Sequence, residues 1–233
     1  VAAPEIAYTA SVDSLLDCVS ERTRILFLAN PNNPTGTGLP FTEIKRLRES
    51  LREDILLVLD AAYAEYCHAD EYRDGSSLVN NAAANVVVLH TFSKIYGLAA
   101  LRVGWAYAPL EIVEVLNNLR GVFTVSTAAQ LCAVAALHDE AHLQKSRTHN
   151  NAARASLSAQ LAALGFNVLP SATNFVCVQF TDSAAAAAAD LLLRQNGLIP
   201  RTLNEYDMPD CLRITVGLTR HCDKVVQLLA STR

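Results

Sequence analysis

The sequence predicts an α/β fold with a mainly parallel sheet, followed by a smaller α+β C-terminal domain. Short runs rich in Val, Ile and Leu alternate with amphipathic helical stretches in the first part of the 233-residue chain. This pattern is typical of buried parallel strands joined by helices. Further on, alternating strands and Ala-rich helices follow a long helical stretch. We therefore expect a large domain over 1–140 and a small one over 141–233.

Residues that cap helices or interrupt them define the elements of the first domain. Ser11 or Asp13 can cap the first helix, and Thr42 the second, which carries Ile44 and Leu47 on one face. The Pro, Asn and Gly residues of 30–38 exclude regular structure there. In chain order we expect strands at 6–8, 25–29, 55–59, 85–89 and 103–107, helices after Ser11, from Thr42 and over 110–121, and a loop with a short helix in 65–84.

The second half is expected to begin with a long helix that starts near Ser126 and continues, with a kink, to about Leu164. Gly165 suits the C-terminal cap of this helix. The domain boundary is placed inside it. After it we expect a strand at 174–180, a helix at 183–195 that ends at Gly197, a strand at 212–216 and a final helix from Thr219.

Composition narrows the class of protein. Apolar residues make up 51% and charged residues 18% of the chain, with a formal net charge of −4. That balance gives no basic surface for nucleic acid. Asp190 and Arg194 interrupt the longest apolar stretch, so no membrane span is expected. The start at Val1 lacks the features of a signal peptide. The six cysteines are scattered without a C-x-x-C pair, and we expect a cytoplasmic protein with reduced thiols.

Three polar clusters follow three of the predicted strands. Residues 30–36 (Asn-Pro-Asn-Asn-Pro-Thr-Gly) follow the first, 60–63 (Asp-Ala-Ala-Tyr) the second, and the segment 91–105 the third. One parallel sheet brings its carboxyl ends to one rim, which is where open α/β sheets bind ligands. The sequence therefore predicts a ligand site built from all three clusters.

The third cluster suits an aldehyde cofactor that carries a phosphate. Lys94 offers an amine that can form a Schiff base with the aldehyde. Thr91, Ser93 and Arg102 offer hydroxyls and a guanidinium for the phosphate oxygens.

Together the three motifs resemble those of the fold-type I aminotransferases, which use pyridoxal phosphate (PLP). The resemblance is nearest to the histidinol-phosphate aminotransferase branch and extends to the segment 213–217 (Arg-Ile-Thr-Val-Gly). It implies PLP as cofactor, an amino donor and a 2-oxo acid as substrates, and a homodimer. It also implies that the chain starts within the family's large domain, so we expect an N-terminal portion of the family chain to be missing.

The resemblance assigns roles to the residues of the large domain. Lys94 is the catalytic lysine, which binds the aldehyde and shuttles the substrate proton. Asp60 keeps the ring nitrogen protonated, and Tyr63 and Asn33 hydrogen-bond to the ring oxygen. Ala61 departs from the family, which often has Glu after this Asp. The phosphate is held by Thr91, Ser93 and Arg102.

Two arginines and an asparagine are implied on the substrate side. Arg213 begins an otherwise apolar strand, where a guanidinium needs an anion. The matching arginine of the family holds the substrate's α-carboxylate. Arg201 resembles the arginine used for the substrate's phosphate, although a solvated loop arginine is an alternative. Asn174 is expected to line the substrate side.

Other motifs are set aside. His138 and His142 are one helical turn apart but lack the H-E-x-x-H pattern and a third ligand, so no metal site is expected. His90 is expected to pack rather than to react. The glycine-rich dinucleotide motif and the P-loop are absent from the sequence, which argues against NAD and ATP sites.

The leading hypothesis is transfer of an amino group from histidinol phosphate to 2-oxoglutarate. An aromatic amino-acid aminotransferase is the nearest alternative, and a decarboxylase of phosphorylated threonine shares the same scaffold. A hypothesis of another class is an inactive fragment that acts as a partial cofactor binder or an assembly partner.

Overall fold

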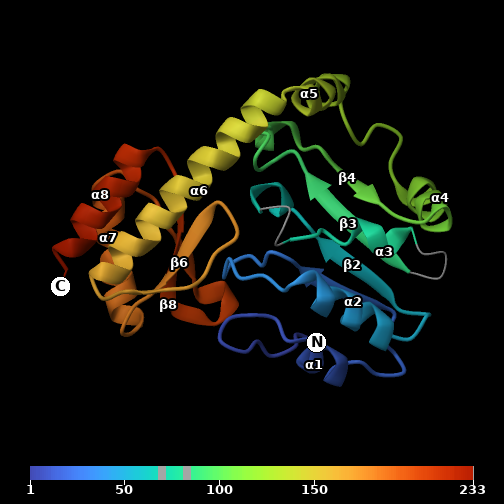
Figure 1. Cartoon of the computed structure of the whole chain (residues 1–233), viewed down its shortest axis with the longest axis horizontal. Helices are drawn as coiled ribbons and strands as arrows, with labels where there is room; N and C mark the ends of the chain where they lie inside the picture. Colours follow the sequence, from blue (N-terminus) through green and yellow to red (C-terminus); the bar gives the residue numbers. More distant parts are fainter. Residues whose placement is uncertain (68–71, 81–84, 233) are drawn as a thin grey trace. The chain divides into compact units, whose positions relative to one another are not determined.

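The computed structural model describes residues 1–67, 72–80 and 85–232. It divides into two compact units (Figure 1). The first unit consists of Val1–Asn32 and Gly38–Lys145, and the second of Asn33–Thr37 and Ser146–Arg233. The loop segment 33–37 thus belongs to the second unit, although it follows the first strand in sequence.

Four strands form the sheet of the first unit in the order in which they occur along the described chain: β1 (Ile25–Ala29), β2 (Leu56–Asp60), β3 (Val86–Thr91) and β4 (Gly104–Tyr107). The first three strands run parallel, and β4 pairs antiparallel with β3. The predicted parallel sheet is confirmed. The carboxyl ends of β1, β2 and β3 therefore lie at the same edge (Figure 1).

One face of this sheet is covered by helices, and the other is open in part. The covered face packs against α1 (Val12–Asp17), α2 (Phe41–Ser50) and α3 (Ser76–Val79). Ile25 and Phe27 point to the opposite face, where they remain 51% and 69% exposed. The core of the covered face is made of Leu26, Leu28, Leu57, Leu59, Val86 and Val88 from the strands and Val12, Ile44, Leu47, Leu78 and Val79 from the helices.

The remaining elements of the first unit follow β2 and β3. Short 3-10 helices occur at Ala64–Tyr66 (η1) and Ala99–Leu101 (η2), and α4 covers Leu110–Leu119. The next helix, α5 (Thr127–His138), packs Ala129 and Ala133 against Phe92 and Val103. This small core fixes the segment that follows β3, which includes Lys94.

The second unit is an antiparallel sheet with helices on one face. Its strands are β5 (Asn167–Val168), β6 (Phe175–Gln179), β7 (Arg201–Leu203) and β8 (Met208–Thr215), in the order β5-β6-β8-β7 within the described residues. The helices that cover this sheet are α6 (Glu140–Ala163), α7 (Ser183–Gln195) and α8 (Thr219–Ala230) (Figure 1). The core between sheet and helices includes Val176, Val178, Leu212 and Ile214 from the strands and Leu157 and Leu161 from α6. A 3-10 helix, η3 (Asn204–Tyr206), joins β7 to β8.

Two predicted details near helix and strand ends are wrong. The strand at 6–8 is a tight turn, in which Ala7 and Tyr8 have positive φ and Ile6 pairs with Thr9. The N-cap of α2 is Pro40, and Thr42 lies inside the helix. Proline suits this position because helix starts have no partner for the first backbone N–H groups.

The long helix predicted from Ser126 is two helices, α5 and α6, which meet at Asp139. Asp139 leaves the helical region, and its Oδ1 accepts a hydrogen bond of 2.9 Å from the N–H of His142. A short acidic side chain can cap a new helix in this way and so end the preceding one. The short strands β5 and β7 were not predicted, and β8 begins four residues before the predicted strand.

Within the described ranges, no helix is both long enough and apolar enough to span a membrane.

Gly104 marks a close approach of β4 to β3. A Cβ atom at this position would lie 2.6 Å from the backbone oxygen of His90. We expect Gly104→Ala to destabilise the first unit by about 1–3 kcal/mol, because the two strands must separate. Urea denaturation measures the change. In Gly121→Ala, the control, the new Cβ meets Thr124 Cγ2 at an ordinary 3.6 Å; equal midpoints for the two variants would contradict the expectation.

Candidate functional site

Asp60 and Lys94 are positioned by the ends of two adjacent parallel strands. Asp60 is the last residue of β2 and pairs in register with Leu89 of β3. Lys94 follows the end of β3 at Thr91 by three residues. The parallel pairing therefore delivers the carboxylate and the segment that bears the amine to the same edge of the sheet.

The two strand ends also present Asp60 and Thr91 on the same face. Registered residues of neighbouring strands point the same way, and side chains alternate along each strand. Asp60 is thus on the side of Leu89 and Thr91 and opposite to Leu59, which belongs to the helix-covered core. Asp60 is exposed on this open face, where its Oδ1 accepts a hydrogen bond of 3.0 Å from Ala62 N–H.

Lys94 lies close to the turn that follows Asp60. Its Nζ is 5.1 Å from the centroid of the Tyr63 ring, a distance at which an ammonium is attracted to an aromatic face. Tyr63 is itself buried, with 5% exposure. The structure thus brings together the Asp60–Tyr63 turn and the lysine that the sequence selected.

Of the three residues predicted to bind the phosphate, Thr91 and Ser93 are hydrogen-bonded to each other, and Arg102 bonds to the backbone. Ser93 N–H donates a hydrogen bond of 3.0 Å to Thr91 Oγ1, which folds the segment tightly after β3. Arg102 is exposed, has a left-handed φ of 54°, and donates to the backbone oxygen of Ala99 at 2.7 Å. Its joint role with Thr91 and Ser93 stays a prediction.

In the second unit, Arg213 and Asn33 are hydrogen-bonded. Arg213 lies in β8, packs over the ring of Phe175 with its Cζ 4.9 Å from the centroid, and donates through an Nη atom to Asn33 Oδ1. Its Nε is buried and has no hydrogen-bond partner in the described part of the chain. An acceptor such as a carboxylate would satisfy this donor.

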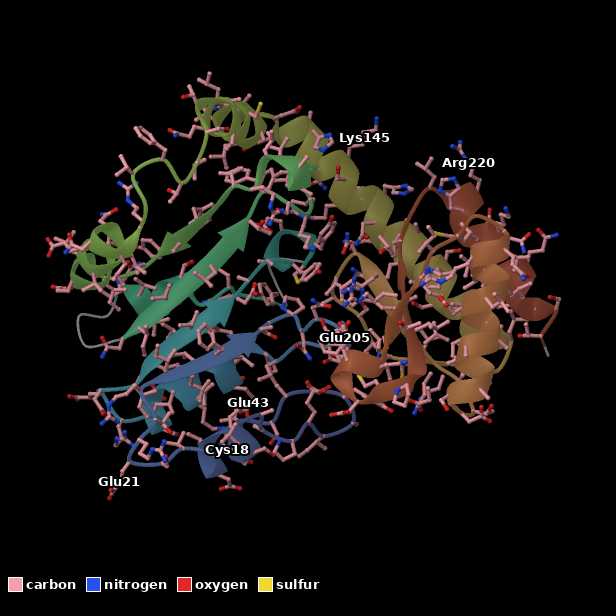
Figure 2. All side chains as sticks on the ribbon, turned by 180° about the vertical axis from the view of Figure 1, so that it is seen from behind. Cys18, Glu21, Glu43, Lys145, Glu205 and Arg220 are labelled. Carbon is pink, nitrogen blue, oxygen red and sulfur yellow. The ribbon has the colours of Figure 1, made fainter. Side chains whose placement is uncertain are left out.

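Arg201 is on the strand next to Arg213. The two arginines are partners in the β7–β8 register and so point to the same face of the sheet. Arg201 is a strand residue rather than a loop residue, and it forms an ion pair of 2.7 Å with Glu205, which Figure 2 labels. Asn174 precedes β6, and its backbone oxygen accepts a hydrogen bond of 2.8 Å from Val216 N–H.

The structure therefore presents the predicted residues as two groups. Those in the first unit are Asp60, Tyr63, Thr91, Ser93, Lys94 and Arg102, and those in the second are Asn33, Asn174, Arg201 and Arg213.

Sequence reasoning missed a charged cluster around the buried His90. Its Nδ1 lies 3.0 Å from Glu65 Oε1, and its Nε2 lies 3.0 Å from Asp74 Oδ2. Glu65 and Asp74 lie in the polar stretch between β2 and β3, which gave no motif. A single signal was available: His90 falls in an otherwise apolar strand, where a polar ring needs partners.

The two carboxylates determine the charge of His90. Burial alone would lower the pKa of the imidazole, but the hydrogen bonds to Asp74 and Glu65 outweigh it and raise the pKa to about 9. Correspondingly, the hydrogen bond to His90 lowers the pKa of Asp74 to about 2. The ring is therefore an imidazolium at neutral pH, with both nitrogens donating.

The described residues contain no group of His, Cys, Asp and Glu side chains that could hold a metal ion. His138 ends α5 and His142 lies in the first turn of α6, so the break at Asp139 separates them.

Comparison with known proteins identifies the family. The model of the family described as aminotransferase class I and II matches residues 4–229, which is nearly the whole chain. A histidinol-phosphate aminotransferase of Granulibacter bethesdensis is 52% identical over 98% of this chain and 62% of its own length. The corresponding protein of Paramagnetospirillum magneticum is 50% identical over 98% of this chain and 63% of its own. The chain thus spans less than two thirds of these relatives.

Solved structures give the same fold. The histidinol-phosphate aminotransferase of Sinorhizobium meliloti, in complex with pyridoxal-5'-phosphate, superposes with a TM-score of 0.90 at 30% identity. The match covers 100% of this chain and 65% of that one.

Proposed function

This chain belongs to the aminotransferase class I and II family, and we propose that it is a PLP-dependent aminotransferase acting on histidinol phosphate and 2-oxoglutarate. The products would be imidazole acetol phosphate and glutamate, a step of histidine biosynthesis. The observation that carries the proposal is the placement of Asp60 and the Lys94 segment at the same edge of adjacent parallel strands. The names of the relatives support the choice of substrate.

The residues present suit PLP. The cofactor supplies an aldehyde that condenses with amines and a pyridinium ring that withdraws electrons. Lysine is the side chain whose primary amine can form a reversible Schiff base with such an aldehyde, and Lys94 offers this amine. Asp60 is an exposed carboxylate on the open face, and the hydroxyl groups of Thr91 and Ser93 can donate to phosphate oxygens.

Each side chain then has a defined task. Lys94 Nζ, when deprotonated, accepts the proton from the carbon that bears the amino group of the bound amino donor. Asp60 holds a proton at the ring nitrogen, because a nearby carboxylate favours the protonated form. Arg213 orients the α-carboxylate of glutamate through a pair of parallel hydrogen bonds, for which its buried Nε is available. Arg201 donates hydrogen bonds to the distal carboxylate of glutamate or to the phosphate of histidinol phosphate.

All six cysteines lie in the described part of the chain, and none of them forms a disulfide there. This supports the proposal that the protein works in a reducing cytoplasm.

Covalent attachment of PLP tests the role of Lys94. We expect borohydride reduction of the chain with PLP to label the peptide that contains Lys94, because the amine condenses with the aldehyde. Lys94→Ala should abolish this label, as measured by mass spectrometry after digestion. Lys145→Ala is the control, since Lys145 is exposed on α6 (Figure 2). Full labelling of Lys94→Ala, or none of the unmodified chain, would overturn the assignment.

Substrate preference tests the rest of the proposal. With 2-oxoglutarate as acceptor, we expect turnover of histidinol phosphate. Arg201→Ala should raise KM for histidinol phosphate about 10- to 150-fold and leave KM for phenylalanine nearly unchanged, because a charged hydrogen bond contributes about 1.5–3 kcal/mol. Turnover of phenylalanine alone would favour an aromatic aminotransferase, and release of CO2 from threonine phosphate a decarboxylase. PLP attachment without any turnover would indicate an inactive fragment.

A homodimer is proposed as the working assembly. Large apolar side chains are exposed on and after α4, among them Leu119 at 77% and Phe123 at 95%. Light scattering should give about twice the chain mass of 25.2 kDa. Phe123→Asp should shift the protein toward the monomer, since a charge cannot be buried without a partner. Leu191→Asp, at an exposed site on α7 in the second unit, is the control. A monomer at about 100 µM unmodified chain would contradict the assembly.

A further inference from the structure

We propose that His90 is a positioning residue, which clamps the Asp60–Tyr63 turn to the strand that leads to Lys94. The inference rests on the proposed function, because it concerns the geometry of the same PLP site. His90 faces the helix-covered side of the sheet, together with Val86 and Val88, whereas its neighbour Thr91 faces the open side. The clamp therefore acts from beneath the proposed cofactor face.

The clamp is a buried imidazolium between two carboxylates. The side chain of His90 is 6% exposed, that of Glu65 13% and that of Asp74 29%. Each ring nitrogen faces one carboxylate oxygen at 3.0 Å. Hydrogen bonds between oppositely charged partners are about twice as strong as those between neutral groups.

The two partners come from different places in the chain. Glu65 lies on η1, two residues after Tyr63, so its bond to His90 ties the turn that contains Asp60 and Tyr63 to β3. Asp74 is fixed in turn by Ser76, whose N–H and Oγ donate to it at 2.9 and 2.8 Å. Its bond to His90 anchors β3 to the start of α3.

Trp105 holds the ring from one side. It pairs with His90 in the β3–β4 register, and the two rings stack with centroids 4.2 Å apart and planes within 5°. A cation over an indole is attracted to it, and the stack fixes the plane in which both nitrogens donate. Gly104, next to Trp105, allows this approach because a Cβ would meet the His90 oxygen.

These contacts connect the Asp60–Tyr63 turn, which follows β2, to the segment after β3 that contains Lys94. The ammonium of Lys94 lies 5.1 Å from the Tyr63 ring, and its position relative to Tyr63 depends on how the turn after β2 sits against β3. Proximity effects make a site sensitive to displacements of about 1 Å. Loosening the clamp should therefore weaken PLP binding, although His90 faces the side of the sheet opposite to Asp60 and Thr91.

The experiment compares four proteins: the unmodified chain, His90→Gln, His90→Arg and the surface control His138→Gln. Glutamine places its donors on one nitrogen and cannot serve carboxylates on opposite sides of a ring. Arginine restores fixed charge and spread donors and stacks on aromatic rings. Equilibrium dialysis measures PLP affinity. We expect about a tenfold loss for His90→Gln, recovery to within about threefold for His90→Arg, and no change for His138→Gln.

A second measurement does not need the cofactor or a folded glutamine variant. In ¹⁵N-labelled unmodified chain at pH 7.5, imidazole spectra should show one histidine with both nitrogens protonated, and this signal should be absent from His90→Arg. If every histidine is neutral at that pH, His90 is not an imidazolium and the proposed charged clamp is wrong.

The two proposals fail in different ways. If the unmodified chain binds PLP and His90→Gln binds it equally well, the clamp has no positioning role and the proposed function stands. If His90→Gln and His90→Arg lose the same affinity, His90 acts through packing alone, which also overturns the inference. If the unmodified chain does not bind PLP, the proposed function falls and the positioning role falls with it.

Discussion

Parallel pairing of β1, β2 and β3 is the constraint on which the rest of the first unit depends. It brings three strand ends, separated by about thirty residues each in sequence, to one edge. Apolar side chains on the helix-covered face hold the strands in register, because a slip of one residue would turn Leu57 and Leu59 away from the core. The same register sets Asp60 on the open face.

The two faces of this sheet have different roles: one forms the core, and the other carries Asp60. Buried leucine and valine side chains on one face stabilise the unit, and a charged cluster at the end of that face, centred on His90, holds the loops that follow the strands. His90 is buried and its two carboxylate partners are partly buried, which is costly unless each ionised group is hydrogen-bonded. In this cluster the imidazolium lies between its carboxylates, so the energetic cost is offset while the directions of the bonds specify a unique loop arrangement.

The second unit has the same division into a helix-covered face and a face with polar side chains, but its sheet is antiparallel. Its helices cover one face, and the register of β7, β8 and β6 places Arg201 and Arg213 on the other. Packing over Phe175 and a hydrogen bond to Asn33 hold Arg213, and its buried Nε has no hydrogen-bond partner among the described residues. A guanidinium held in this way is prepared for an anion, since little side-chain freedom remains to be lost on binding.

The sequence by itself determined the α/β architecture, the parallel strands and the motif around Lys94, because apolar periodicity and turn residues are local properties of the chain. It did not determine the break at Asp139, the short strands β5 and β7, or the place of Arg201 in a strand. These features depend on capping and on partners distant in sequence. Only the tertiary structure joined Glu65, Asp74 and His90, since no spacing along the chain marks three groups that meet through loops.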